Sequence, residues 1–344
     1  MYLKRTTLFL IGFALLFALF YSLDIDEFIN VTSRIGWEWF LLILCIQLLI
    51  ILLMGLRWYV IIERYGVSFS NVMQTSIIGY MVNNLTPMSI AGGEPVRVFV
   101  ISKLEKIKTE KAFATVLVEL FLGLTPTLLI NLIAIILVFQ HSFDVYIIGI
   151  LGLMGIVNLM LFGSCLTLFL KKEPSLFLIH WILSLVKKIG FLRTRAESVE
   201  SQLDELFESF RRSINTTLMN VRTMALGFSI SVLVWTFTFF KVYIIFMAIG
   251  IEIDIADMII VYAILVAVGV LPLIPGALGI WEWMGVVLFS MFGIPKEAAA
   301  AVIIIDRLFF YWLPILLGSI ASVKVGLSVR TLMEREGVDQ SKLL

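Results

Sequence analysis

Charged residues are scarce in this sequence. Asp, Glu, Lys and Arg make up 15% of its 344 residues, whereas soluble proteins carry about a quarter. Hydrophobic residues supply 60%, and the mean hydropathy is +1.04. They gather in unbroken blocks of about 20 residues, the length that a helix needs to cross a membrane. The composition therefore predicts an all-α polytopic membrane protein rather than a β-barrel, and we expect no nucleic-acid partner.

Cysteine and histidine are rarer still, with two of each. Cys45 and Cys165 both lie inside apolar blocks, so we expect neither a disulfide framework nor a metal site. His141 and His180 are far apart and are interpreted as interfacial loop residues. The phosphate-binding pattern Gly-x-x-x-x-Gly-Lys-Ser/Thr is also missing. We therefore expect no cofactor, and any direction of transport must come from gradients, substrate supply or a partner.

Six apolar segments are long enough to span a membrane. They cover residues 5–22, 38–62, 112–139, 144–170, 223–249 and 297–322. Two further apolar regions, 71–100 and 256–293, are broken near their middles by proline and glycine. The first segment follows Lys4 and Arg5 as a signal peptide would, but no small-residue cleavage site follows it. We therefore expect a retained first helix.

The segments that connect these blocks are alternately rich and poor in basic residues. If both broken regions return to the side from which they enter, twenty-one Lys and Arg lie on one side and two on the other. Nine of the twenty-one lie in residues 171–222. Because Lys and Arg concentrate in cytoplasmic loops, we predict six spanning helices plus two re-entrant helical hairpins. The protein is then expected in the cell membrane with both termini cytoplasmic.

The long cytoplasmic loop, residues 171–222, contains an amphipathic pattern in "ESVESQLDELFESFRRSI". Its apolar residues fall on one helical face, with charges opposite. We interpret it as a helix that rests its apolar stripe on the bundle or on lipid headgroups; a regulatory or partner site is the alternative. The stripe consists of Val199, Leu203, Leu206, Phe207, Phe210 and Ile214.

A shift of 188 residues aligns four unusual positions without a gap. Pro87 falls on Pro275, Glu94 on Glu282, Glu119 on Arg307, and Pro126 on Pro314. The two repeat units are about 71–139 and 256–325. From the 112–139 helix to the 297–322 helix there are three crossings, so the units are expected to run in opposite directions. We therefore predict an inverted-topology repeat within a single integral membrane domain that covers residues 1–344.

Proline, glycine and amide residues mark the expected tips of the two hairpins. Irregular backbone at membrane depth is tolerated only where protein or water surrounds it, so we expect the tips to approach each other near the membrane middle. Glycine permits positive φ and close backbone approach, and a helix that starts at a tip favours anions. Asn83 and Asn84 are alternatively simple caps of the first helix. The predicted tip residues are Asn84, Pro87, Gly92, Gly93, Pro275, Gly276 and Gly279.

Charged residues inside apolar helices are a second sign of function, because each costs roughly 2.5–3.5 kcal/mol on insertion scales. Glu119 and Arg307 either form an ion pair that locks the bundle, or Arg307 faces a hydrated cavity and attracts phosphate. Asp306 is expected to pair with Arg307 or with Lys241. Lys241 itself either snorkels toward the membrane surface or belongs to the site.

Two arginines near a cytoplasmic helix end, Arg57 and Arg64, are interpreted as snorkelling anchors. Among the polar residues within helices, Gln47 is interpreted as contact between helices. The remaining charged positions of the hairpins and deep helices define the candidate site. The predicted substrate-binding residues are Arg307, Glu282, Glu94, Arg97, Glu119, Lys241 and Asp306.

The segments "NNLTPMSIAGGEPVRVFVISK" and "LPLIPGALGIWEW", the latter followed by "EAAAAVIIIDRLFFYWLP", carry a resemblance. The chain resembles the lysylphosphatidylglycerol synthase transmembrane region, or flippase-like domain family, over about residues 5–325. The resemblance implies translocation of a phospholipid or lipid-linked headgroup. The best-known members also carry a cytosolic aminoacyl-transferase domain, whereas this chain is expected to be a stand-alone member. In the family the first-half Glu is usually followed by Arg; here Glu119 is followed by Leu120, which leaves Arg307 as the principal deep cation.

The leading hypothesis is a lipid flippase or transporter that moves an anionic phospholipid or a polyprenyl-phosphate headgroup, and not an enzyme. The alternatives are an integral membrane transferase, or an accessory subunit in polyprenyl-phosphate sugar or envelope-lipid metabolism. An envelope-biosynthesis enzyme would then be its partner. A transferase needs an acidic cluster at a membrane face, and "DIDEF" and "EIDIAD" are better explained by the charge asymmetry of the loops.

Overall fold

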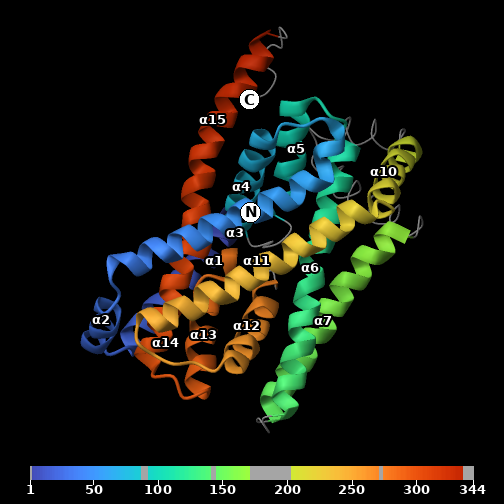
Figure 1. Cartoon of the computed structure of the whole chain (residues 1–344). Coiled ribbons are helices and arrows are strands. Elements are labelled where there is room, and N and C mark those ends of the chain that lie inside the picture. Colours follow the sequence, from blue (N-terminus) through green and yellow to red (C-terminus); the bar gives the residue numbers. More distant parts are fainter. Residues whose placement is uncertain (1, 87–91, 141–144, 171–202, 271–273, 336–344) are drawn as a thin grey trace.

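The computed structural model describes residues 2–86, 92–140, 145–170, 203–270 and 274–335, and every element within these ranges is helical (Figure 1). The all-α class predicted from composition is therefore confirmed for this part of the chain. Pro87 and residues 171–202 lie outside it. The elements are α1 Tyr2–Ser22, α2 Ile25–Ser33, α3 Trp37–Ile62, η1 Glu63–Tyr65, α4 Phe69–Leu85, α5 Glu94–Glu105, α6 Thr109–Gln140, α7 Val145–Leu170, α10 Leu203–Leu218, α11 Val221–Ala248, α12 Ile255–Val270, η4 Pro275–Ala277, α13 Ile280–Met291, α14 Lys296–Arg307, the π-helical η5 Leu308–Trp312 and α15 Leu313–Arg335.

Four helical stretches within the described ranges are long and apolar enough to cross a membrane. They are Trp37–Tyr65, Thr109–Phe139, Val221–Ala248 and Lys296–Gly326. Each coincides with a span expected from the sequence. The other two expected spans fall on α1 and α7, where the described apolar stretches are Leu10–Ser22 and Leu151–Ser164. The chain is thus a multi-pass helical membrane protein, with four candidate spans by length and composition in the part that the structure describes.

The order of elements from α3 to α6 recurs from α11 to α15. Each set begins with a long helix, continues with two shorter helices, and ends with a long helix that is interrupted by η5 in the second set. We call these the first set and the second set. In each set the break between the two shorter helices falls at one of the two proline–glycine regions noted in the sequence.

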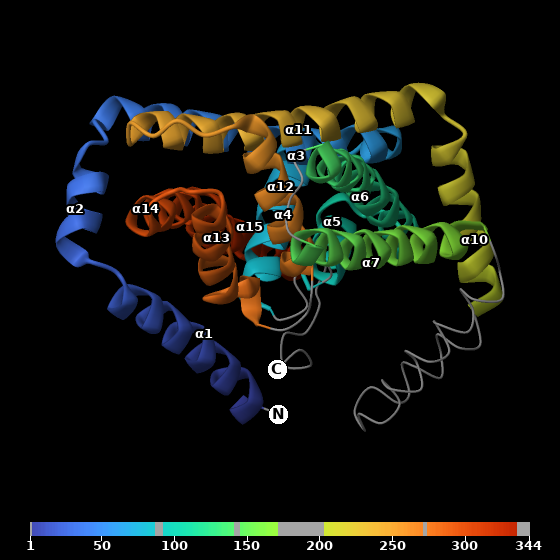
Figure 2. The same cartoon turned by 90° about the horizontal axis from the view of Figure 1, so that it is seen from below.

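The two sets exchange partners. The long helices α3 and α11 pack side by side, and Figure 2 shows them running together between α2 at one edge and α10 at the other. The shorter helix α4 packs against α15 of the second set, and α12 packs against α6 of the first set. Gly318 permits the first of these contacts, because a Cβ atom there would lie 2.9 Å from the carbonyl oxygen of Ile77.

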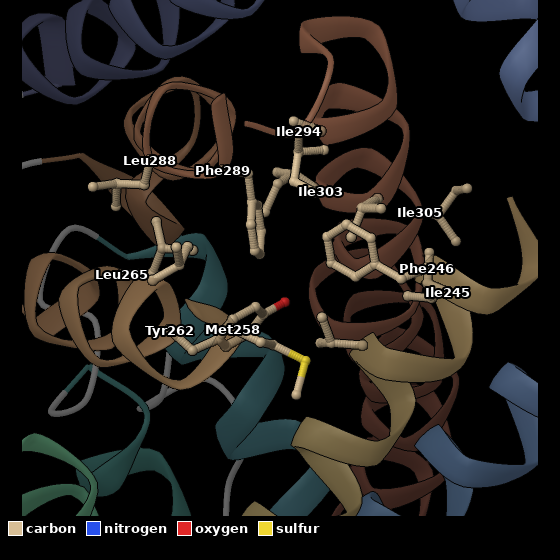
Figure 3. Packing of buried hydrophobic residues seen from close by; sticks show 14 of the residues in the cluster. Ile245, Phe246, Met258, Tyr262, Leu265, Leu288, Phe289, Ile294, Ile303 and Ile305 are labelled. Atoms are coloured by element: carbon tan, nitrogen blue, oxygen red, sulfur yellow. The ribbon is translucent and has the colours of Figure 1, made fainter. Parts of the chain in front are cut away.

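The largest apolar core lies where α11, α12, α13 and α14 meet (Figure 3). Phe246 of α11 and Phe289 of α13 face each other edge-on, with ring centroids 5.1 Å apart. Tyr262 of α12 packs beside them and is 2% exposed. Aromatic pairs of this kind stabilise a core by about 0.5–1.5 kcal/mol beyond the area they bury. This core fixes the position of α13 and α14, which carry part of the candidate site.

The amphipathic helix α10 lays its apolar face on α6. Ile214 is 1% exposed, and the ring of Phe210 stacks on that of Phe113 with centroids 5.5 Å apart. The Nη2 atom of Arg64 donates a hydrogen bond to the carbonyl oxygen of Ser213 at 2.9 Å. This placement matches the interpretation in which the stripe rests on the bundle. Val199, at the start of the predicted stripe, lies outside the described residues.

Candidate functional site

A cavity of about 310 Å³ lies at the centre of the bundle. Its described lining residues come from both sets, including the tip segment η4, and from none of α1, α2, α7 or α10. The walls combine apolar side chains with amides and charged groups. Two clusters of buried charges adjoin this cavity, one from each set.

The first charge cluster consists of Arg57 of α3, Glu94 and Arg97 of α5, and Glu119 of α6, all at most 7% exposed. The Nη1 atom of Arg97 bridges the two carboxylates, at 2.8 Å from Glu94 Oε2 and 2.9 Å from Glu119 Oε2. Arg57 binds the other oxygen of Glu119 through Nε, at 2.7 Å, and through Nη2. Two positive and two negative side chains therefore balance within one cluster.

This geometry corrects three interpretations made from the sequence. Glu119 does not pair with Arg307; its partners are Arg57 and Arg97. Arg57 is not a snorkelling anchor, because it is 7% exposed and its third nitrogen, Nη1, donates to Ser231 Oγ of α11 at 3.3 Å. Arg307 is also not the single principal deep cation, since Arg57, Arg97 and Lys241 are equally buried.

The second charge cluster consists of Lys241 of α11, Glu282 of α13, and Asp306 and Arg307 of α14, all at most 4% exposed. Lys241 pairs with Asp306 at 2.7 Å, which is one of the two partners expected for Asp306. Arg307 Nε donates to Glu282 Oε1 at 2.6 Å. This cluster is balanced as well, with two charges of each sign.

Neutral groups complete the second charge cluster from neighbouring helices. Gln47 of α3 accepts a hydrogen bond from Lys241 Nζ at 2.7 Å, which agrees with its interpretation as a contact between helices. The Tyr262 hydroxyl donates to Asp306 Oδ2 at 3.1 Å. Lys241 therefore bonds within the bundle rather than reaching a membrane surface.

Gly276 and Gly279, expected at the tip of the second hairpin, form hydrogen bonds with residues of the second charge cluster. Gly276 has φ +56° and Gly279 has φ +82°, a region that glycine adopts without steric cost. The carbonyl of Gly276 accepts a hydrogen bond from Arg307 Nη2 at 2.8 Å. The N–H of Gly279 donates to Glu282 Oε2 at 2.6 Å, which caps the start of α13. Pro275, which opens η4, is buried.

Gly92 and Gly93, expected at the tip of the first hairpin, contact the end of α4 closely. Asn83 Oδ1 accepts a hydrogen bond from the N–H of Gly93 at 2.6 Å. A Cβ atom at Gly93 would collide with the backbone of Gly79 in α4, and one at Gly92 would collide with Thr86. Both predicted glycines are therefore positions of close approach. Asn83 joins the tip to α4 rather than merely capping a helix.

Asn84 connects the first set to the second. Its Nδ2 donates to the carbonyl of Tyr311 at 3.0 Å, and the Tyr311 hydroxyl donates back to the carbonyl of Asn84 at 3.2 Å. Tyr311 belongs to the π-helical η5, and its ring centroid lies 4.3 Å from Arg307 Cζ. π-Helical turns of this kind are frequent at functional sites. The end of α4 thus lies against the η4 tip and the second charge cluster.

Sequence reasoning missed Arg57, Tyr80 and Tyr262 as cavity residues. Arg57 lies five residues before the end of α3, a depth that suits a snorkelling side chain equally well. The two tyrosines have ordinary apolar neighbours in the sequence, so only the packing of α4 and α12 brings them to the cavity. For these three residues, the sequence offers one signal of a place in the cavity: Arg57 is flanked on both sides by apolar residues.

These features define a multi-pass α-helical membrane protein with a charged cavity buried between two sets of helices. Residues 7–318 match the family described as the lysylphosphatidylglycerol synthase TM region. Since the match covers most of the chain, the protein belongs to that family, as its sequence motifs suggested.

Similar proteins are described only as "UPF0104 membrane protein". One from Methanothermobacter thermautotrophicus is 26% identical over 95% of this chain and 97% of its own length. One from Pyrococcus horikoshii is 28% identical over 93% and 97%, and one from Methanocaldococcus jannaschii is 28% identical over 92% and 94%. These names support a membrane protein and specify no activity.

Proposed function

We propose that the protein moves a lipid with a phosphate-bearing headgroup across the cell membrane. The observation that carries this proposal is the central cavity, whose charged lining is drawn from both sets. Ionisable residues inside a bundle are expensive and mark pathways for polar substrates. The headgroup would occupy the cavity while its acyl chains remain in the bilayer.

The exchange of partners between the sets supports an inverted repeat with two re-entrant hairpins. α4 packs on α15 as α12 packs on α6, and these helix pairs are equivalent under the shift of 188 residues. In transporters with inverted repeats, substrate binds near the bilayer midplane between the repeats, next to broken helices. The hairpins α4–α5 and α12–α13 would then gate the cavity from opposite sides.

Contacts between helix ends support six spans with cytoplasmic termini. Lys296 Nζ donates to the carbonyl of Ser22 at 2.5 Å, and the sequence assigns both residues to the outer side. Arg64 and Ser213, which the sequence assigns to the cytoplasmic side, are joined by the hydrogen bond described above. These contacts join segments assigned to the same side.

Lipid movement in proteoliposomes tests the proposal. We expect a fluorescent phosphatidylglycerol to exchange leaflets, as measured by chemical quenching from outside, faster in liposomes with the protein than in empty ones. Arg307→Ala should slow this movement by about tenfold to a hundredfold, because a hydrogen bond to a charged group contributes about 1.5–3 kcal/mol. Equal rates in empty and protein-containing liposomes would contradict a flippase.

The matched control is Arg34→Ala, at the exposed C-terminal end of α2 and outside the cavity lining. It should leave the rate unchanged. Arg307→Lys retains a positive charge opposite Glu282, and its elution as a single species on size exclusion distinguishes slow transport from unfolding. A normal rate in well-folded Arg307→Ala would remove Arg307 from the proposed pathway.

A further inference from the structure

The cations of the two charge clusters differ in how many hydrogen-bond donors they have left. Arg57 uses all three of its nitrogens. Arg307 uses Nε and Nη2, and Lys241 bonds both Gln47 and Asp306. In contrast, Arg97 uses only Nη1; its Nε and Nη2 are buried and have no hydrogen-bond partner among the residues that the structure describes. Among the described cations of the two charge clusters, Arg97 therefore has the most nitrogens without a hydrogen bond, two against one for Arg307.

The free atoms of Arg97 form one edge of its guanidinium, and this edge is buried in the structure. Nε and Nη2 lie on the same side of a guanidinium and donate two parallel hydrogen bonds, a geometry that matches two oxygens of a phosphate. Arg97 lines the cavity, as does Tyr80, whose buried hydroxyl also lacks a partner within the described part of the chain. The Cζ atom of Arg97 lies 4.3 Å from the ring centroid of Trp58, which holds the guanidinium in place. Buried donors without partners are costly, so a ligand that satisfies them binds favourably.

Charge balance limits how such a ligand enters. The first charge cluster is neutral, with Arg57 and Arg97 against Glu94 and Glu119. An added phosphate would leave an excess negative charge in a buried site, which is strongly unfavourable unless it is neutralised. A proton taken up by one of the carboxylates restores the balance.

Of the two carboxylates in the first charge cluster, Glu94 has the fewer hydrogen bonds from cations to stabilise its negative charge. Glu119 binds two arginines, whereas Glu94 receives only a share of Arg97 Nη1 and a long hydrogen bond of 3.4 Å from Asn83 Nδ2. The groups that face Glu94 are Arg97 on its own helix, Tyr80 of α4 and Glu119 of α6. The neighbouring helix α15 meets α5 through apolar side chains.

We propose that Arg97 binds the phosphate ester of the substrate through its Nε–Nη2 edge, and that Glu94 takes up one proton as the phosphate binds. Protonated Glu94 retains a carbonyl oxygen that accepts from Arg97, so the cluster keeps its geometry. The phosphate can come from a lipid headgroup or from free phosphate. The proposal rests on the proposed function and adds to it the coupling of the substrate to protons.

Calorimetric titration of the purified full-length protein in two buffers of different ionisation enthalpy measures the protons taken up per ligand bound. The probes are a short-chain phosphatidylglycerol and, separately, inorganic phosphate. We expect an uptake of about one proton and an affinity that falls about tenfold for each unit of rising pH. Binding without proton uptake, or no binding of either probe, would overturn the proposal.

Glu94→Gln tests the acceptor, because the amide keeps the size of the side chain and mimics the protonated acid. Its binding should release or take up no proton and should lose the pH dependence. Glu252→Gln, an exposed position between α11 and α12 and outside the cavity lining, should behave as the unaltered protein does. Unchanged proton uptake in Glu94→Gln would overturn the role of Glu94.

Arg97→Lys tests the binding edge. It keeps the positive charge next to Glu94 and Glu119 but removes the two parallel donors, and we expect about tenfold weaker binding of both probes. Full affinity in Arg97→Lys would overturn the assignment. Lipid movement without proton uptake would contradict this inference alone. Proton-coupled binding of inorganic phosphate without lipid movement would sustain it and contradict the proposed lipid transport.

Discussion

Glu119 holds two arginines at once, from α3 and from α5. Removing one partner of a buried ion pair leaves an uncompensated charge and costs about 3–5 kcal/mol. We therefore expect Glu119→Gln to lower the free energy of unfolding by about that amount, measured by SDS-induced unfolding in detergent micelles. The loss should be the largest among single carboxylate-to-amide changes of the first charge cluster, because Glu94 shares its arginine.

Two further variants test whether Glu119→Gln lowers the free energy of unfolding because it leaves buried charges unpaired. Glu252→Gln makes the same chemical change at an exposed position. It should alter the free energy of unfolding by less than about 0.5 kcal/mol. The double variant Glu119→Gln with Arg57→Gln should recover part of the stability, since fewer unpaired charges remain. An unfolding curve of Glu119→Gln that superimposes on that of the unaltered protein would refute this account of the cluster.

At the scale of elements, helices differ in how much the sequence reveals. The break between α4 and α5 and the start of α13 could be predicted, because Gly93 and Glu282 are costly in an apolar helix. The pairing of Arg57 with Glu119 could not. α3 is apolar on all sides, so the direction in which Arg57 points depends on its packing against α6 and α11. The partners of a buried charge are set by that packing and not by spacing along the chain.

The helix α10 is the opposite case, because its one apolar face predicts its packing against the bundle. Ile214 is 1% exposed on that face, and deleting such a side chain costs about 2–5 kcal/mol. We expect Ile214→Ala to speed amide hydrogen exchange throughout α10, measured by mass spectrometry. Thr216→Ala on the exposed face should leave exchange unchanged. Equal exchange in the two variants would mean that α10 is not held by this contact.

At the scale of the whole molecule, the shift of 188 residues predicted the correspondence between the two sets of helices. It did not predict their exchange of partners, because contacts between α4 and α15 or between α12 and α6 join regions far apart in the sequence. The exchange has a mechanical consequence for the proposed transport. If α4–α5 and α12–α13 are the proposed hairpins, movement of one would be transmitted to the long helix of the other set, so the two sides of the cavity would open in turn.

The proposed re-entry of α4–α5 places both of its flanking segments on the same side of the membrane, whereas a single crossing places them on opposite sides. Ser70 and Thr109 are exposed residues that flank this region. In a background with Cys45→Ser and Cys165→Ser, we expect Ser70→Cys and Thr109→Cys to react with an impermeant maleimide only after the cells are permeabilised. Ser33→Cys, on exposed α2, should react in intact cells.

A single crossing would place Ser70 and Thr109 on opposite sides, so that one of them reacts in intact cells. That outcome would also separate the cytoplasmic segment around Arg64 from the basic residues that follow α5, against the tendency of Lys and Arg to remain inside. It would contradict both the re-entrant hairpin and the inverted repeat built on it. If neither Ser70→Cys nor Thr109→Cys reacts in intact cells, the proposed hairpin tip stays within the bilayer, and Arg97, which follows it, lines the cavity.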